Sequence, residues 1–129
     1  MATNQTDVQR LAGQVRVALE TADLDAYREL LDPAVSWGPP DDQVSGCHNR
    51  DQVLAWYRQG RANGVRADVV ETVVDRDRIL VGLKVRQDSG GVDPSAEHDR
   101  WQLLTVVDGR IKDIRGFDDR DEAIERLHR

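Results

Sequence analysis

The chain has 129 residues, a formal net charge of -6 and 33% charged residues. This length supports one core, so residues 1–129 are predicted to form a single domain. A negative surface without a basic run argues against non-specific binding to nucleic acid or to anionic membranes, because both require a basic surface.

Three features bear on the cellular compartment. The polar N-terminus MATNQTDVQR lacks the apolar core of a signal peptide, and no apolar stretch approaches the length of a membrane span. The single cysteine, Cys47, excludes an internal disulfide, which fits a reducing compartment. We therefore predict a cytoplasmic protein that does not bind a membrane.

The start of the chain carries the periodicity of helices. Thr6 and Gln9 form a capping-box pattern, and apolar residues then recur at helical spacing over residues 7–21. A second, short helix is predicted in DLDAYRELLD, with Asp23 or Asp25 as its N-cap and Pro33 at its end. Residues 34–37 then predict a short strand.

A third helix follows an irregular loop at residues 38–46, where prolines and glycines break both regular patterns. Asn49 is a favourable N-cap for this helix, with Gln52 at the capping-box distance. Gly60 and Gly64 end it.

The second half of the chain changes to the period of strands. Residues 66–74 and 78–87 predict two strands, and residues 88–97 predict a loop. Residues 98–119 predict a hairpin, because the Asp-Gly pair at 108–109 is the strongest short hairpin signal.

Helices followed by a meander of strands predict an α+β fold, closed by a short helix that Asp119 caps. Three stretches, ALETADLDAYRELLDPAVSW, GCHNRDQVLAWY and DGRIKDIRGF, resemble the nuclear transport factor 2-like superfamily, and within it small SnoaL-like actinobacterial proteins. The resemblance covers most of the chain. It implies a cone-like, curved and mostly antiparallel sheet that wraps around three N-terminal helices and encloses a cavity.

The superfamily includes ketosteroid isomerases, dehydratases, epoxide hydrolases, polyketide cyclases and non-catalytic binders, so the resemblance does not select one function. Ketosteroid isomerases carry an inward, protonated Asp on the strand of Asp99, but Val15 and Pro39 stand where they have their Tyr and base Asp. Epoxide hydrolases use Arg-x-Asp with an inward Asp on the last strand, whereas this chain has Asp99-Arg100 and Gly116. Neither mechanism transfers residue by residue.

The two-residue turn predicts the register of the final hairpin, because paired positions then keep a constant sum. Trp101 falls opposite Gly116, which leaves room for a ligand ring, and Asp99 falls opposite Asp118. Opposed carboxylates in a partly apolar cavity can share a proton and serve as acid and base. Alternatively, both side chains lie in water at the strand ends.

Further candidate site residues come from the helices and the first strand. His48 is predicted to assist catalysis, with a surface or capping histidine as the alternative. The cysteine and the three histidines lack metal-ligand spacing, and no phosphate-binding loop is present, so neither a metal nor a cofactor is predicted. The predicted ligand-binding residues are the following, of which the aromatic side chains could equally form plain core: Trp37, Trp56, Tyr57, Trp101, Gly116 and Tyr27.

The same register predicts an apolar patch on the outer face of the sheet, which is too large to leave in water. A second copy of the chain is its simplest cover, so we predict a homodimer through this face. The residues placed on the outer face are Arg100, Gln102, Leu104, Val106, Ile111, Asp113, Arg115 and Phe117, with Leu80 from the preceding hairpin.

The sequence therefore favours a cavity protein that binds a small, partly apolar metabolite. If it is an enzyme, proton transfer, isomerisation, dehydration or cyclisation is expected, with Asp99 and Asp118 as acid and base and His48 assisting. The rival hypothesis is a non-catalytic binding or interaction module. A cavity closed by aromatic side chains favours the rival, and an open cavity with both aspartates inward favours the enzyme.

Overall fold

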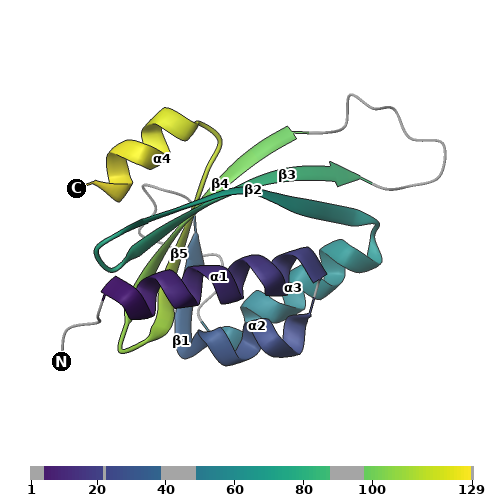
Figure 1. Cartoon of the computed structure of the whole chain (residues 1–129). Helices are drawn as coiled ribbons and strands as arrows, with labels where there is room; N and C mark the ends of the chain where they lie inside the picture. The colour runs from purple at the N-terminus through teal and green to yellow at the C-terminus, as the bar shows by residue number, and fades with distance from the viewer. Residues whose placement is uncertain (1–4, 22, 39–48, 88–97, 129) are drawn as a thin grey trace.

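The chain folds into helices packed on a five-stranded sheet, as the computed structural model shows (Figure 1). The structure describes residues 5–21, 23–38, 49–87 and 98–128. The α+β class predicted from the sequence is confirmed. The elements are α1 (Gln5–Thr21), α2 (Leu24–Leu30), β1 (Leu31–Gly38), α3 (Arg50–Ala62), β2 (Val65–Asp75), β3 (Arg78–Gln87), β4 (His98–Val107), β5 (Arg110–Phe117) and α4 (Arg120–Leu127).

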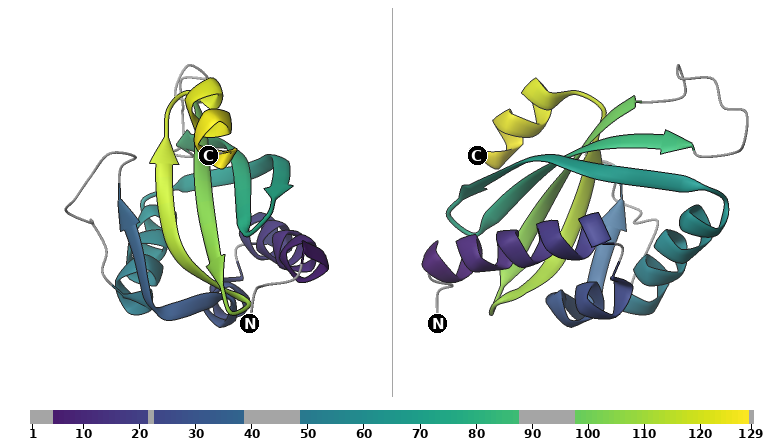
Figure 2. Two further views of the ribbon diagram at one scale, coloured as in Figure 1. Left: turned by 90° about the vertical axis from the view of Figure 1, so that its left-hand side faces the viewer. Right: turned by 45° about the vertical axis from the view of Figure 1, so that its right-hand side comes forward.

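The strands lie in the order β1-β5-β4-β3-β2. β1 runs parallel to β5, and the other neighbours are antiparallel. Figure 2 shows the sheet curving around α1, α2 and α3, with α4 on the opposite side. We call the face toward α1–α3 the inner face and the face toward α4 the outer face.

Three helices begin at N-cap residues that the sequence predicts. The side chains of Asp23, Asn49 and Asp119 each accept a hydrogen bond from a backbone N–H two or three residues later, at 3.1, 2.9 and 3.1 Å. Each such bond satisfies a donor that the first turn leaves without an intrahelical partner. These caps fix where α2, α3 and α4 leave the preceding chain.

The first strand is longer than predicted. It begins at Leu31, directly after α2, and runs through Pro33, whereas the sequence predicts a strand over residues 34–37. Leu31 pairs with Ile111 of β5, and the register shifts before Ser36. Proline is tolerated here because β1 is an edge strand, where a missing backbone donor faces no neighbour.

Apolar side chains form one core on each face of the sheet. The inner core joins α1–α3 to the sheet, and α4 seals a smaller one, the outer cluster. Because strand residues alternate between faces, neighbours such as Ile79 and Leu80 belong to different cores. The outer cluster consists of Leu80, Leu103, Phe117, Ala123 and Leu127.

The β4–β5 hairpin departs from the predicted register. Asp108 and Gly109 have φ of 53° and 79°, as a two-residue turn of this type requires. The first two pairs, down to Val106 with Ile111, are the predicted ones. Thr105 then pairs with Asp113, so β5 carries one extra residue, a β-bulge.

The bulge makes the predicted cross-strand pairs wrong beyond this point, because one extra residue shifts every later pair by one position. Trp101 lies opposite Phe117, and Gly116 lies opposite Gln102. Asp118 forms an ion pair with Arg100 at 3.1 Å instead of facing Asp99. The two aspartates are therefore not an opposed pair.

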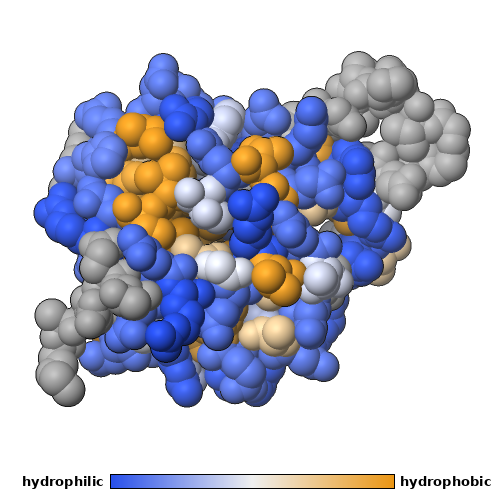
Figure 3. All heavy atoms as spheres, in the orientation of Figure 1, coloured by the Kyte–Doolittle hydropathy of each residue, from blue (hydrophilic) through white to orange (hydrophobic). Residues whose placement is uncertain are grey.

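The predicted outer apolar patch is also wrong. Leu104, Val106 and Ile111 are buried in the inner core, while Leu80 and Phe117 are buried beneath α4. The homodimer consequently stays a prediction without that support. Figure 3 shows a different cluster of apolar side chains on the viewed face, between α4 and α1. No helix among the described residues is long and apolar enough to cross a membrane.

Candidate ligand-binding cavity

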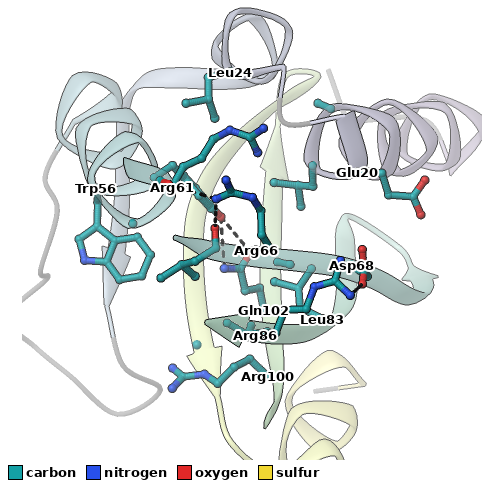
Figure 4. A pocket seen from close by; sticks show the side chains of 18 of the residues that line it. Glu20, Leu24, Trp56, Arg61, Arg66, Asp68, Leu83, Arg86, Arg100 and Gln102 are labelled. Carbon is teal, nitrogen blue, oxygen red and sulfur yellow. Dashed lines mark hydrogen bonds and ion pairs between the residues drawn. The ribbon is translucent and has the colours of Figure 1, made fainter. Parts of the chain in front are cut away.

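A cavity of about 400 Å³ opens on the inner side of the sheet, where α1, α2 and α3 meet all five strands (Figure 4). This volume lies in the range of small-molecule sites in proteins. The cavity is not packed shut by side chains, so the closed cavity that would favour the rival hypothesis is not found.

An aromatic wall forms one side of this cavity. The rings of Trp37 and Tyr57 are stacked, with centroids 5.2 Å apart and planes inclined by 27°. Trp56 meets Trp37 edge-on at 4.7 Å and is 58% exposed. A ligand ring can extend such a stack, because aromatic faces favour offset stacking.

Tyr27 lies behind this wall and is not among the described residues that line the cavity, so its predicted contact with a ligand gains no support. Its side chain is fully buried, and its ring packs edge-on against Tyr57 with centroids 5.5 Å apart. Burial is the main cause that raises the pKa of Tyr27 well above its ordinary value, and the neighbouring Tyr57 hydroxyl adds to it. Tyr27 therefore remains neutral and supports the position of Tyr57.

The cavity floor carries a buried amide that the sequence reasoning placed on the outer face. Gln102 is only 7% exposed, and the Tyr57 hydroxyl lies 3.3 Å from its Oε1 and 3.2 Å from its Nε2. An amide offers two N–H donors and two acceptor lone pairs. One hydroxyl cannot satisfy all four, so Gln102 retains capacity to bind a polar group of a ligand.

Gly116 lies beside Gln102 on the same floor and leaves space above itself. A Cβ atom at this position would come no closer than 3.6 Å to Arg100 Nη2 and 4.0 Å to Trp37 Nε1. These are ordinary van der Waals distances. The absence of a side chain at Gly116 thus extends the cavity beneath Trp37.

Trp101 occupies a different place from the predicted one. It borders the cavity between Arg100 and Gln102, but its indole Nε1 donates a hydrogen bond to Glu71 at 3.4 Å and its ring packs against the outer cluster. The glycine it covers is Gly82, where a Cβ atom would lie 3.2 Å from Trp101 Nε1 and 2.9 Å from Glu71 Cγ. The predicted contact of Trp101 with Gly116 is therefore wrong, and Trp101 instead covers Gly82 on the outer face.

The predicted catalytic residues do not come together in the described part of the chain. Asp99 is exposed and pairs in register with Lys84 of β3. The Asp118 side chain is 85% exposed and bonded to Arg100. Neither aspartate is among the described residues that line the cavity. His48 lies outside the described residues, so its predicted role stays a prediction.

Arginines give the cavity a charge that the overall composition does not suggest. Arg61, Arg66, Arg86 and Arg100 line it, together with the acidic residues Glu20 and Asp68. The described residues contain no group of three histidine, cysteine, aspartate or glutamate side chains able to hold a metal ion. The site can therefore offer aromatic surface, one amide and guanidinium groups.

Comparisons with known proteins identify the family of this chain. A family model described as the SnoaL-like domain matches residues 12–114. The chain belongs to this family. No curated protein sequence matches the chain.

Solved structures resemble this SnoaL-like protein over most of its length. Bal32a, from a soil-derived mobile gene cassette, has a TM-score of 0.73 at 20% identity, and the match covers 98% of this chain and all (100%) of that one. An LEH-like epoxide hydrolase from M. tuberculosis has a TM-score of 0.66 at 17% identity, covering 95% and 90% of the two chains. TerC, co-crystallised with polyporic acid, has a TM-score of 0.69 at 15% identity, and the match covers 95% of this chain and 99% of that one. At these identities, the likeness shows the fold alone.

Sequence reasoning missed Gln102 and the arginines for different reasons. Gln102 was placed on the wrong face because the bulge in β5 pairs it with Gly116, where the predicted register has Trp101. A signal for that bulge is present, since Ile111 and Ile114 are both fully buried in the inner core although residues three apart in a regular strand face opposite ways. Arg61 and Arg66 carry no comparable signal, because charged residues near a helix end are usually solvated.

Proposed function

We propose that this SnoaL-like protein binds a small, partly apolar metabolite with an aromatic or otherwise flat portion. One observation carries the proposal: an open cavity places the Trp37–Tyr57 stack and the buried Gln102 amide around the same space. Apolar sites with a few placed polar groups are typical of small-molecule binding.

The parts of the cavity suggest distinct contacts with such a ligand. The flat portion would extend the stack formed by Trp37 and Tyr57, over the space that Gly116 leaves free. A hydroxyl or carbonyl group would bind the Gln102 amide, which is held in place by Tyr57. The exposed Trp56 lies at the edge of this wall, where it can cover part of a bound ligand.

The structural neighbours are consistent with this proposal. TerC, which shares the fold, was co-crystallised with polyporic acid, so a protein of this architecture is associated with a small organic ligand. Another neighbour is named an epoxide hydrolase, and this name describes an enzyme that acts on epoxides. Cofactor-free chemistry by Asp99 and Asp118 gains no support from their geometry, since they neither oppose each other nor line the cavity.

Calorimetric titration with 2-naphthamide, an uncharged bicyclic aromatic amide, tests the proposal in the wild-type protein and in Gly116→Val. The valine would occupy the floor beneath Trp37, in space that is open in the wild type. We expect binding by the wild type and about a ten-fold or greater loss of affinity in the variant, equal to about 1.4 kcal/mol of binding free energy.

The control is Gly13→Ala, which adds a methyl group in a separate groove between α1 and α2. Circular dichroism checks that each variant is folded. Affinity that is unchanged in Gly116→Val but lost in Gly13→Ala would place the ligand in the other groove. If a panel of uncharged and anionic bicyclic aromatic compounds gives no binding at all, the proposal is wrong.

A further inference from the structure

The charges around the cavity are unevenly neutralised. Arg86 forms an ion pair with Asp68 at 3.3 Å, and Arg100 forms one with Asp118 at 3.1 Å. The remaining acidic lining residue, Glu20, pairs with Arg16 at 3.1 Å, and Figure 4 shows its carboxylate pointing away from the arginines. The other two lining arginines, Arg61 and Arg66, thus lack a carboxylate from the cavity lining.

Arg66 is held by backbone rather than by an acid. Its Nη1 donates hydrogen bonds to the carbonyl oxygens of Arg61 and Val65, both at 3.0 Å. A guanidinium has five N–H donors, so the donors on Nε and Nη2 remain for another acceptor. Such a guanidinium is positioned before any ligand arrives, because two carbonyls already fix its orientation.

Arg61 adds a second positive charge at the same end of the cavity. Its side chain makes no ion pair or hydrogen bond with the described residues. It follows Tyr57 by four residues on α3, so both side chains project from the same helix face, one turn apart. Figure 4 shows the Arg61 and Arg66 side chains extending into the space between α3 and the strands.

We propose that the metabolite carries an anionic group, most simply a carboxylate, which Arg61 and Arg66 bind while its flat portion lies against Tyr57 and Trp37. The inference rests on the proposed function and specifies its ligand class. A carboxylate offers acceptors that match the planar fork of a guanidinium, and charge-assisted hydrogen bonds are stronger than neutral ones. It would also neutralise two cations that receive no carboxylate from the described cavity lining. The local excess of positive charge contrasts with the net charge of -6 of the whole chain.

A matched pair of ligands separates this inference from the proposed function. Calorimetry would compare 2-naphthoate with its neutral analogue 2-naphthamide, using the wild-type protein, Arg61→Gln and Arg66→Lys. We expect the wild type to bind the carboxylate about ten-fold more tightly than the amide, and Arg61→Gln to remove most of that difference. Arg66→Lys keeps the charge but loses the fork, so it should weaken carboxylate binding to a smaller degree.

Binding of the amide is the internal control for an intact cavity, and it should change by less than about two-fold in each variant. The matched control variant is Arg58→Gln, which removes the same charge from an exposed position of α3 that does not line the cavity. Equal affinity of the wild type for both ligands overturns the inference and leaves the proposed function standing. An equal loss in Arg58→Gln and Arg61→Gln overturns it too, because the preference would then reflect overall charge. Binding of neither ligand overturns both.

Discussion

Two glycines on the strands that flank β4 show how differently the faces of this sheet are used. Gly82 on β3 is covered on the outer face, where Glu71 and Trp101 would lie 2.9 and 3.2 Å from an added Cβ atom. Gly116 on β5 faces the cavity, where the nearest group would be 3.6 Å away. The first glycine permits close packing, and the second leaves a space.

The difference is carried by adjacent residues of β4. Trp101 points outward and is bonded to Glu71, which also binds Arg120 of α4 through two hydrogen bonds of 2.7 and 3.2 Å. Gln102 points inward, and among the described residues its side-chain amide bonds to the Tyr57 hydroxyl. The outer face therefore uses its polar groups to hold α4 to the sheet, whereas the inner face leaves the Gln102 amide facing the cavity, where we propose that a ligand binds.

The largest expected effect on stability comes from adding a methyl group at Gly82, the glycine that Glu71 and Trp101 cover. Gly82→Ala should lower the free energy of unfolding by about 1–3 kcal/mol, because Glu71 and Trp101 must move to admit the new Cβ atom. Gly116→Ala should change it by less than about 0.5 kcal/mol. Urea unfolding followed by circular dichroism measures both values. Equal losses in the two variants would contradict the contrast between the faces.

Exchanging the adjacent β4 residues for leucine should separate stability from binding. Trp101→Leu should lower the free energy of unfolding by about 1–3 kcal/mol, since it removes packing over Gly82 and the hydrogen bond to Glu71. Gln102→Leu should change it by about 1 kcal/mol or less, yet weaken binding of 2-naphthamide by about ten-fold. Urea unfolding and calorimetry on both variants provide the comparison. A binding loss in Trp101→Leu alone would reverse the assignment of faces.

A smaller effect is expected from acid. Hydrogen bonds from Arg120, and then from Trp101, hold the pKa of Glu71 below its ordinary value of 4.5. A group with a lowered folded-state pKa contributes stability above its unfolded pKa and loses it as the pH falls through the folded value. The wild type should therefore lose stability on acidification below about pH 4.5, and Glu71→Gln should lose less.

Urea midpoints measured at about pH 6 and about pH 3 test this prediction. Some acid sensitivity should persist in Glu71→Gln, because the Ala34 backbone N–H, at 2.8 Å, and Lys112 also lower the pKa of Asp32 on β1. The double variant with Asp32→Asn should be less sensitive still. Identical acid dependence in the wild type and Glu71→Gln would show that the outer contact contributes nothing through its charge.

Much of the fold follows from local signals in the sequence. The N-caps at Asp23, Asn49 and Asp119 and the Asp108-Gly109 turn depend on side-chain and backbone chemistry within a few residues. The register beyond the turn does not. The bulge in β5 lets Ile111 and Ile114 both reach the inner core, and that gain comes from distant residues of the helices.

The candidate site was also predictable in part, where the signal lies in the residues themselves. Trp37, Trp56 and Tyr57 were identified as ligand candidates from their residue type and positions, and all three line the cavity. Gln102 is predicted on the wrong face because the expected register pairs Gly116 with Trp101, whereas the bulge in β5 pairs Gly116 with Gln102. The sequence gives no signal for Arg61, since whether its charge is neutralised depends on which acidic residues lie near it in space.

The indole N–H resonances of the three tryptophans offer the most direct test of the cavity. In a ¹H–¹⁵N NMR titration with 2-naphthamide, Trp37 and Trp56 should shift, because both line the cavity, and Trp37 Nε1 lies above Gly116. Trp101 should shift little, because its Nε1 is bonded to Glu71 on the outer face. A shift of Trp101 with Trp37 and Trp56 unmoved would contradict ligand binding in the inner cavity.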